Sequence, residues 1–501
     1  MASRKLGRLR QLTLGLVVFL LIIIFNSYLV SPSASEQVFK VATEPTFPPF
    51  EMPAPEGGGL EGFDIDLMNA IGQEAGFKVE FESLPFDGII PALQSRTVDA
   101  AISGMTITAE RATTVSFSRP YFKSGLAIAV QKDNQDINSF AELENKKIAV
   151  QIGTTGARAV EKIPGAQIRT FDNAPLALQE LANGNVDAVV NDAPVTLYAI
   201  KTGNLQGLKV VGELLTEEYY GIALPKNSAA LDTINNALLT LIENGTYRTI
   251  YQRWFAGEPL PLPASAPALI AVAAESINLR LILANLLRGS SVTLELTAFS
   301  AFLGMIGGSL LAFARISPYP PLSWLSRLYV DFFRGTPLLV QIFMIYFGLP
   351  ALFQQLGLDF NLGRFPAAIT ALSLNASAYL AEIVRGGIQS IEKGQWEASQ
   401  SLGMSYVQTM SYVIFPQAFR RMLPPLGNEF IALLKDTSLV AVIGFEELFR
   451  QGQLIVATTY RAFEIYAAVA LIYLALTLLS SRAFSWLEDW MNPVKHSSLK
   501  G

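Results

Sequence analysis

Apolar residues are unevenly distributed along the chain, which divides it into two regions that suit different solvents. Residues 265–490 contain long apolar runs, whereas residues 36–260 carry charged side chains at ordinary density. Over the whole chain 51% of residues are hydrophobic and 16% are charged, against about 25% charged residues in soluble domains. We therefore predict a water-exposed region and a membrane-embedded region, within the two to four domains that 501 residues allow.

Composition also argues against several classes of function. The net charge is −5, and no basic cluster is interleaved with aromatic residues, which argues against nucleic-acid binding. Because there are no cysteines and the single histidine, His496, lies in a polar tail, we expect no metal site and no catalytic residue. No Gly-x-x-x-x-Gly-Lys-Ser/Thr sequence is present, so we expect no ATP site and no other cofactor in this chain.

The first 35 residues have the pattern of an export signal. Four basic residues precede the uncharged stretch 11–30, and basic residues stay on the cytoplasmic side of a membrane. The stretch is long enough to span a bilayer, but Ser33 and Ser35 also offer the small residues that signal peptidase requires. Residues 1–35 are thus either a signal peptide or a retained membrane anchor.

Residues 36–257 have the alternating pattern of a soluble α/β domain. Segments 38–43 and 147–151 are strand-like, and Asp64 and Asp66 open a helical segment as favourable first-turn residues. Alternation of strands and helices predicts parallel sheets with crossover helices. About 220 residues suit two lobes better than one, and we place the second lobe at about 128–219.

Prolines mark the boundary between the two regions. Residues 258–268 form a stiff linker with four prolines in its first ten residues. The following membrane region, 269–490, has about five candidate spans, and the tail 491–501 follows it. The candidate spans are 290–314, 328–352, 366–388, 424–445 and 465–486.

The cationic residues between these spans predict the topology. If residues 36–260 are outside the membrane, the loops near 315–334 and 385–421 are cytoplasmic. Those loops carry Arg315, Arg327, Arg334, Arg385, Lys393, Arg420 and Arg421, and the opposite loops carry Arg364, Arg450 and Arg461. Seven cations against three agree with the positive-inside rule, and five spans leave the C-terminal tail in the cytoplasm.

A set of phrases in the soluble region resembles the periplasmic binding proteins for polar amino acids. The phrases, which occur in order through the region, are TEPTFPPFEM (43–52), GFDIDL (62–67), FDGIIPALQS (86–95), SGMTITAERATTVSFSRPYF (103–122), VQIGTTG (150–156) and NVDAVVNDAPV (185–195). The resemblance implies a two-lobed α/β domain that closes over a free amino acid.

A free amino acid carries a carboxylate and an ammonium, and burying either without a partner is costly. We expect Arg111 to bind the carboxylate, since arginine is its natural bidentate partner and Thr108 would cap the helix that carries it. The alternative is a surface arginine paired with Glu110. Asp192, at a strand end, would accept the ammonium, or it is an ordinary helix N-cap before Pro194.

The resemblance assigns further binding residues around these two charges. Hydroxyl and N–H groups of the loop with Ser103, Gly104 and Thr106 would hold the carboxylate, and Thr155 would add a donor or serve only as a cap. Phe47 and Phe86 would sandwich the side chain of the ligand, or they are ordinary core residues. Glu44 and Gln151 would meet the far end of that side chain.

The residues at the far end bear on specificity. An acid at position 44 suits a basic or amide side chain. The family's glutamine binders have a basic residue where this chain has Gln151, so we expect basic amino acids, glutamine, or both as ligands.

The membrane region resembles the type I ABC permeases for amino acids. The phrases are FFRGTPLLVQ (332–341), NASAYLAEIVRGGI (375–388) and EASQSLGMSYVQTMSYVIFPQAFRRMLPPL (397–426). The last carries the coupling-helix pattern Glu397-Ala398, Gly403 and Pro416, where a glycine permits a sharp turn between short helices. The resemblance implies docking of a separate ATPase subunit, which supplies the ATP, and a second permease, either another copy or a homologue.

Charged residues within the spans are candidates for the translocation path. Glu382 is one such residue; the alternative is a simple ion pair with Arg385, three positions further along the helix. Lys435 and Asp436 line the path or brace the permease dimer.

Together these observations predict an α/β binding domain followed by an all-α transmembrane permease. The two would form an ATP-driven amino-acid importer. We expect it in a bacterial inner membrane, where it contacts membrane lipid. A ligand-gated channel would need its pore to interrupt the binding domain, and the domain is uninterrupted. A membrane-tethered sensor is the third alternative. The predicted coupling loop argues against both alternatives, because neither a channel nor a sensor needs one.

Overall fold

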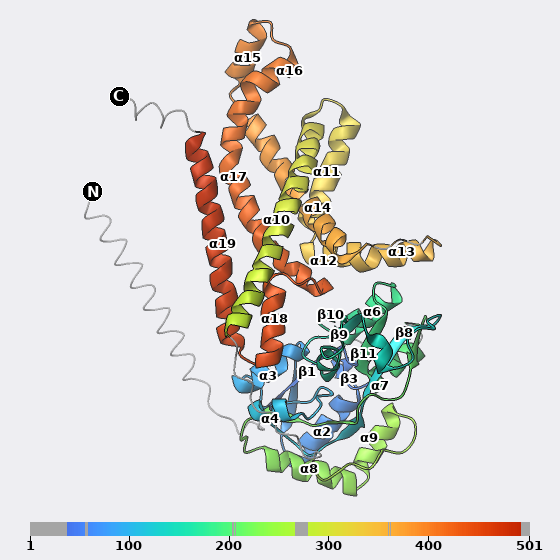
Figure 1. The fold of residues 1–501 in the computed structure, drawn as a ribbon. Coiled ribbons are helices and arrows are strands. Elements are labelled where there is room, and N and C mark those ends of the chain that lie inside the picture. The colour runs from blue at the N-terminus through green and yellow to red at the C-terminus, as the bar shows by residue number, and fades with distance from the viewer. Residues whose placement is uncertain are drawn as a thin grey trace, which may run out of the picture.

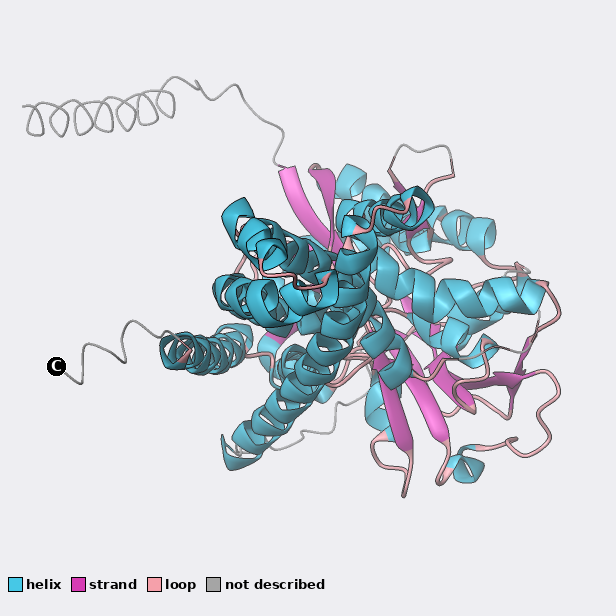
Figure 2. Ribbon diagram, turned by 90° about the horizontal axis from the view of Figure 1, so that it is seen from above, coloured by secondary structure: helices cyan, strands magenta, loops and turns pink. Residues whose placement is uncertain are grey.

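The computed structural model describes residues 38–55, 59–202, 205, 207–265, 279–358, 360 and 362–491. The predicted signal or anchor, the last residues of the linker and the tail beyond Met491 lie outside the described residues. The described chain consists of an α/β domain and a bundle of long helices (Figure 1). Every described strand belongs to the α/β domain (Figure 2).

The first lobe is built on a five-stranded sheet of order β4-β1-β5-β14-β6. Its first three strands are parallel, whereas β14 pairs antiparallel with β5 and β6. Strands and helices of this lobe are β1 (Val38–Thr43), β2 (Met52–Pro53), β3 (Leu60–Glu61), α2 (Phe63–Ala75), β4 (Lys78–Ser83), α3 (Phe86–Gln94), β5 (Ala100–Ala101), α4 (Ala109–Thr114), β6 (Val115–Phe117), β14 (Ala223–Pro225), α8 (Leu231–Glu243) and α9 (Thr246–Trp254).

The second lobe has a sheet of order β10-β9-β11-β8-β12. Strands β9, β10 and β11 are parallel, and β8 pairs antiparallel with β11 and β12. Its elements are β8 (Leu126–Gln131), η1 (Phe140–Leu143), β9 (Lys147–Gln151), α5 (Thr155–Val160), β10 (Gln167–Phe171), α6 (Ala174–Ala182), β11 (Ala188–Asp192), α7 (Ala193–Lys201) and β12 (Leu208–Val211).

The strand predictions for 38–43 and 147–151 are confirmed. The prediction of purely parallel sheets is wrong, because the chain leaves the first lobe and later returns to it. This path places β8 in the second sheet and β14 in the first sheet in the direction opposite to the other strands. The two crossings, β7 (Phe122–Ser124) and β13 (Glu218–Tyr220), pair with each other antiparallel between the lobes.

The helical region follows, and its long helices lie side by side (Figure 1). Its elements are α10 (Leu279–Ile316), α11 (Pro320–Gly335), α12 (Leu338–Phe343), η2 (Met344–Gly348), α13 (Leu349–Gln355), α14 (Arg364–Gln389), α15 (Lys393–Ser401), α16 (Tyr406–Gln408), η3 (Thr409–Ile414), α17 (Phe415–Asp436), η4 (Thr437–Ile443), α18 (Leu448–Thr459) and α19 (Ala462–Trp490).

Length and composition identify fewer spans in the described residues than the five predicted. Three helices, α10, α14 and α19, are long and apolar enough to cross a membrane, and the bent pair 320–335 and 338–353 would make a fourth. That pair turns by 106°, so 328–352 is not one straight helix. Proline at position 337 accounts for the break, since the residue before proline is disfavoured in helical conformation.

The expected span 424–445 also differs from a simple membrane helix. Helix α17 ends at Asp436 and continues as the tighter helix η4. Its charged residues keep it below the apolarity of a typical span; these are Arg420, Arg421, Glu429, Lys435 and Asp436.

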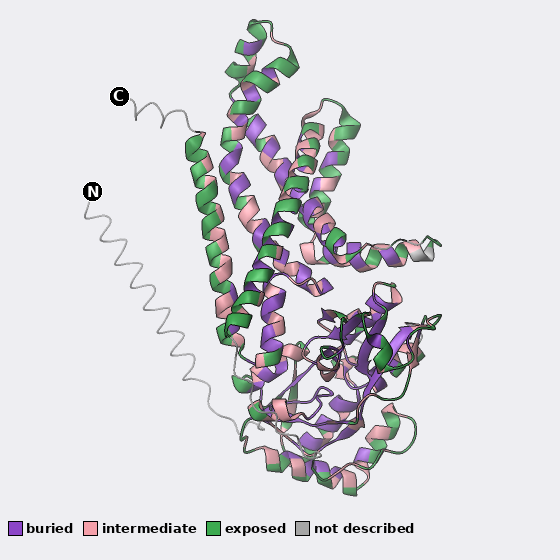
Figure 3. Cartoon of the chain, viewed as in Figure 1, coloured by how far each residue is buried: buried purple, intermediate pink, exposed green. Residues whose placement is uncertain are grey.

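The two ends of the helix bundle carry different parts of the chain. The α/β domain lies at the end formed by α18, while α15, α16 and the α10–α11 connection lie at the opposite end (Figure 1). The α10–α11 connection, which follows Arg315, and the segment with Lys393 are therefore at the end away from the α/β domain, whereas Arg334 lies in the last turn of α11, next to α12, and not in a loop. Burial is concentrated within the α/β domain and between the bundle helices, while α19 is exposed along most of its length (Figure 3).

Candidate functional site

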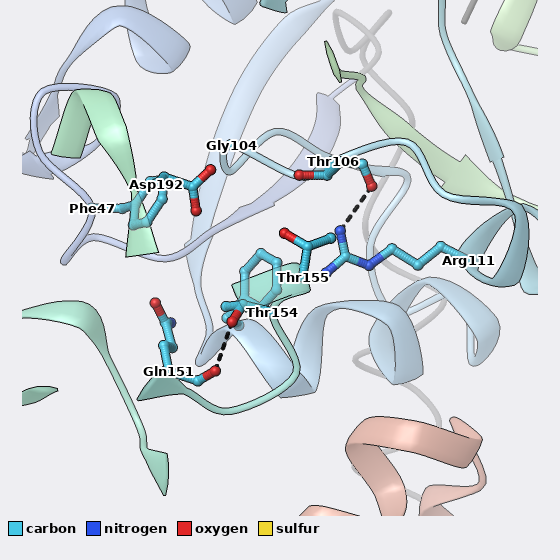
Figure 4. A pocket seen from close by; sticks show the side chains of 9 residues that line it. Phe47, Gly104, Thr106, Arg111, Gln151, Thr154, Thr155 and Asp192 are labelled. Carbon is cyan, nitrogen blue, oxygen red and sulfur yellow. Dashed lines mark hydrogen bonds between the residues drawn. The ribbon is translucent and has the colours of Figure 1, made fainter. Parts of the chain in front are cut away.

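The two lobes of the α/β domain surround a small cavity. Residues from both lobes line it (Figure 4): Phe47, Phe86, Gly104, Thr106, Arg111, Gln151, Thr154, Thr155 and Asp192. Eight of the ten predicted binding residues thus lie in the lining. Glu44 and Ser103 lie behind it, and Thr154 was not predicted.

Arg111 is a buried cation, with 4% of its surface exposed. The Thr108 side chain caps α4 by accepting a hydrogen bond from the Arg111 backbone N–H, which confirms the predicted cap. The guanidinium donates to the carbonyl of Thr106 at 2.8 Å and, across the lobes, to that of Gly153 at 2.9 Å. It forms no ion pair with a described residue, and the alternative partner Glu110 pairs with Arg158 instead.

Phe86 contributes to the same site from α3. The Arg111 guanidinium carbon lies 5.3 Å from the centre of the Phe86 ring, within cation–π range. Since arginine has five N–H donors, donors remain for a carboxylate after the two carbonyl bonds. Arg111 is therefore set up to receive an anionic group.

Asp192 is a buried anion on the far side of the cavity from Arg111 (Figure 4). It stands at the N-cap position of α7, but its side chain makes no capping bond and instead accepts a hydrogen bond from the Tyr220 hydroxyl. The simple N-cap interpretation is therefore wrong. Burial, together with the charge of Glu218, raises the pKa of Asp192 to about 7, against the Tyr220 hydrogen bond and the Arg111 charge, which lower it.

Glu44 and Gln151 form a contact between the lobes. The Gln151 amide donates to Glu44 Oε2 at 2.7 Å and to the Asp172 carbonyl at 3.3 Å. Burial raises the pKa of Glu44 to about 7, against the hydrogen bonds from Gln151 and Thr46. Gln151 thus lines the cavity, and Glu44 reaches it only through this amide.

Ser103 lies behind the cavity and supports the loop that contains Gly104 and Thr106. Its hydroxyl donates to Glu51 at 2.6 Å and accepts from the Glu44 backbone N–H at 3.0 Å. Asp64, predicted as a first-turn residue, is fully buried and accepts from the Gly104 N–H at 2.9 Å and the Tyr121 hydroxyl at 2.7 Å. Burial raises the pKa of both carboxyls, that of Asp64 to about 6 and that of Glu51 well above its usual range.

Glu218 is a further site residue that the sequence did not reveal. It lies on β13 and accepts from Thr106 at 2.6 Å and from Thr155 at 3.0 Å, which belong to different lobes. Thr154, rather than Thr155, is the side-chain cap of α5. Glu218 follows another glutamate, and no motif distinguishes it; only the fold brings it between two predicted residues.

The segment predicted to couple to an ATPase projects from the opposite end of the bundle (Figure 1). Glu397 and Ala398 are exposed on α15, and Pro416 is in the first turn of α17. Gly403 has φ of +77°, as its predicted turn requires, and an added Cβ would meet no atom within 4 Å. Glycine is needed there for its backbone conformation. Large apolar side chains around it are exposed: Leu402, Tyr406, Val407 and Tyr412.

A second cavity, larger and more open than the first, lies among the bundle helices. Its lining comes from α11, α12, α14 and α17: Arg334, Gly335, Thr336, Pro337, Leu338, Asn375, Tyr379, Glu429, Ala432 and Asp436. Of the three predicted path residues, Asp436 is in this lining, whereas Lys435 and Glu382 are not. Glu382 forms ion pairs with Arg385 at 2.7 Å and Arg315 at 3.1 Å. Glu429 is an unpredicted carboxyl in the same lining.

Two family models match the chain. Residues 39–257 match the bacterial extracellular solute-binding proteins, family 3. Residues 304–493 match the binding-protein-dependent transport system inner membrane component.

Individual relatives cover one region each. The glutamine transport system permease protein GlnP of Escherichia coli (strain K12) is 44% identical over 206 residues, which are 41% of this chain and 92% of the relative. The arginine transport system permease protein ArtQ of Bacillus subtilis (strain 168) is 41% identical over 194 residues, 39% of this chain and 86% of the relative. A solved ancestral arginine-binding protein bound to arginine is 48% identical, with a TM-score of 0.43, and covers 44% of this chain and 98% of its own.

The two family models, the permease relatives and the fold define an amino-acid ABC transporter permease with a fused solute-binding domain, a transport protein rather than an enzyme. The chain belongs to the family of binding-protein-dependent transport system inner membrane components, with a family 3 solute-binding domain preceding the permease. The resemblances predicted from the sequence motifs are confirmed for both regions.

Proposed function

We propose that the chain captures a polar amino acid outside the cytoplasmic membrane and passes it through its own permease. The observation that carries this proposal is the pair of opposite buried charges in the cavity. Arg111 has no acidic ion-pair partner and Asp192 no basic one among the described residues. Because unpaired buried charges are costly, a zwitterion with a carboxylate at Arg111 and an ammonium at Asp192 satisfies both.

The proposed substrates are basic amino acids, glutamine, or both. Glu44 accepts hydrogen bonds from Gln151 and Thr46, so a substrate cation or amide would have to share this carboxylate. The charges of Asp87 and Asp172 act on Glu44 as well, which makes this end of the domain acidic. An acidic end favours a cationic side chain. Permeases named for glutamine and for arginine are both among the relatives.

The proposed mechanism is alternating access powered by a separate ATPase subunit that binds ATP. The exposed apolar side chains around Gly403 suit a groove on such a subunit, since large exposed patches mark interaction sites. Movement of this segment would open the permease toward the binding domain, which then releases its ligand. A second permease completes the two-fold assembly, and Asp436 and Glu429 would face the path.

The proposed location is a bacterial inner membrane, with the binding domain on the outer side. The α10–α11 connection, which follows Arg315, and the segment with Lys393 lie at the end opposite the binding domain, which supports this orientation. The fusion keeps a binding domain beside its permease at an effective concentration on the order of millimolar.

Calorimetric titration of the detergent-solubilised full chain with arginine, lysine, histidine and glutamine tests the binding site. We expect micromolar or tighter binding of at least one, weakened about 100-fold or more by Arg111→Ala, because two charge-assisted hydrogen bonds are worth about 3 kcal/mol or more. Asp192→Asn should weaken binding comparably. Arg248→Ala, at an arginine that is 60% exposed on α9, is the matched control. Binding of none of the four, or binding that survives Arg111→Ala, would overturn the assignment.

A further inference from the structure

One permease helix, α18, contacts both lobes of the binding domain. On the first lobe, Tyr460, which directly follows α18, is buried among Ile89, Ile90 and other core residues around α3. On the second lobe, the Arg158 guanidinium donates to the carbonyl of Ala457 at 3.5 Å. The helix therefore lies across the junction between the lobes (Figure 1).

Arg450, near the start of α18, is the most deeply buried of these contacts, with none of its side chain exposed. It forms an ion pair with Asp172 and donates to the carbonyl of Thr170 at 2.7 Å, both just beyond or at the end of β10. Its positive charge also acts on Asp87 of the first lobe, where it opposes the burial that raises the pKa of that carboxyl. One permease cation thus attracts an acid on each lobe.

The backbone before α18 closely contacts the end of β10. Gly444 has φ of +67°, and a Cβ on it would lie 2.6 Å from the Thr170 carbonyl oxygen. The permease therefore fits this part of the second lobe both by charge and by close backbone approach.

A short chain of contacts connects Arg450 with the ligand cavity. Arg450 holds the side chain of Asp172, and the carbonyl of Asp172 accepts from the Gln151 amide at 3.3 Å. The same amide donates to Glu44 of the first lobe and lines the cavity. Displacement of Asp172 would therefore disturb the Gln151 amide, which joins the two lobes beside the cavity.

We propose that Arg450 is a positioning residue through which the permease holds its own binding domain closed and so raises its affinity for the ligand. This inference rests on the proposed function, since it concerns the same cavity. A contact that favours the closed state and a ligand that favours the closed state must strengthen each other.

The test is binding of radiolabelled arginine and, in parallel, glutamine to the full chain in lipid nanodiscs, with affinities and dissociation rates measured. We expect Arg450→Gln to weaken binding about tenfold, equivalent to about 1.4 kcal/mol, through faster dissociation. Asp172→Asn should have a similar effect, and the double variant should be no weaker than either single one. The reversed pair Arg450→Asp with Asp172→Arg should recover part of the affinity, which a merely structural role would not produce.

Arg461→Gln, at an exposed arginine shortly after α18, is the matched control and should bind as the wild type does. If Arg450→Gln fails to fold, Arg450→Lys retains the charge but not the planar fork, and should weaken binding by less than tenfold. Wild-type affinity in Arg450→Gln or Arg450→Lys, or additive effects at 450 and 172, would overturn the proposal. If the wild-type chain binds neither amino acid, the proposed function itself fails, and this inference falls with it.

Discussion

Helix α2 of the binding domain and helix α10 of the permease have opposite distributions of side chains. Helix α2 buries large apolar residues: Phe63, Ile65, Leu67, Met68 and Ile71. Helix α10 buries mostly small or hydroxyl-bearing residues, which include Gly289, Ser290, Thr293, Thr297, Ser300, Gly304 and Gly308. Its large apolar side chains point outward, such as Phe302 and Leu310, which are 65% and 66% exposed.

This difference indicates which interaction drives packing in each region. In water, burial of large apolar side chains is the dominant favourable term. In a bilayer the surroundings of a helix are as apolar as its side chains, so close approach of small residues and interhelical polar contacts decide packing. The same chain therefore has two kinds of core, and substitutions should affect them in opposite ways.

Truncation of an aromatic residue should give the largest contrast. Phe63→Ala should lower the free energy of unfolding of the binding domain by about 3–5 kcal/mol, because it removes a fully buried ring and leaves a cavity. Phe302→Ala, on the outer face of α10, is the matched control and should leave that domain's thermal unfolding unchanged. Equal shifts in melting temperature for the two variants would contradict the distinction.

Enlargement of a small residue should affect the permease instead. A Cβ at Gly308 would lie 2.7 Å from Leu380 Cβ and 3.0 Å from the Ala381 backbone nitrogen of α14. Gly308→Val should therefore destabilise the bundle by about 1–3 kcal/mol, seen as earlier loss of the monodisperse detergent-solubilised chain on heating. Gly386→Ala, where an added Cβ meets no atom within 4 Å, should be tolerated. Equal tolerance of both would argue against close α10–α14 packing.

Acid should weaken ligand binding by a smaller amount. With the pKa of Asp192 near 7 before ligand binds, a fall in pH from 7 to 6 leaves most molecules with a neutral acid opposite the ammonium. Affinity should then drop by up to about tenfold per pH unit, while Asp192→Asn should bind weakly at every pH. Titrations at pH 8, 7 and 6 measure this, and an unchanged affinity would contradict the role of Asp192.

Stability of the ligand-free chain should change with pH in the opposite sense. The folded pKa of Asp192 and that of Glu44 lie above unfolded values near 4. The folded state therefore binds protons that the unfolded state has released, so this stabilisation is complete below about pH 4 and is lost as pH rises through about 7. Thermal unfolding between pH 4.5 and 8 checks the sign, and a rise in stability over that range would count against these shifts.

The smallest effect on stability is expected at the exposed apolar side chains near Gly403. Val407, 71% exposed, should tolerate replacement by glutamate with less than about 0.5 kcal/mol change in stability. Val407→Glu should nevertheless reduce copurification with a cognate ATPase subunit, while Lys393→Gln, at another exposed residue of this segment, should not. Undiminished copurification of Val407→Glu would place the docking surface elsewhere.

Local patterns in the sequence predicted much of the fold and of the site. The strand-like segments at 38–43 and 147–151 were located correctly, and Thr108 predicted the cap that orients Arg111. These predictions succeed because neighbours along the chain determine such features. Proline at 337, after Gly335, also marked the break between α11 and α12, but the apolar run around it hid the signal.

What the sequence did not reveal depends on contacts between distant residues. Glu218 joins Thr106 and Thr155 only because β13 crosses between the lobes. Arg450 was assigned to a loop by the charge count, yet it pairs with Asp172 of the binding domain, 278 positions earlier. Glu44 was placed at the ligand, although Gln151 stands between it and the cavity.

The most direct test of the binding site compares ligands that differ only in the two groups that Arg111 and Asp192 are proposed to bind. The full chain should be titrated with arginine, with its decarboxylated amine agmatine, and with Nα-acetyl-arginine, or with the matching glutamine derivatives if glutamine binds more tightly. Recognition of a zwitterion predicts binding of the free amino acid and affinities at least about 100-fold weaker for both derivatives. Binding of agmatine or of the acetylated form as tightly as the free amino acid would contradict it.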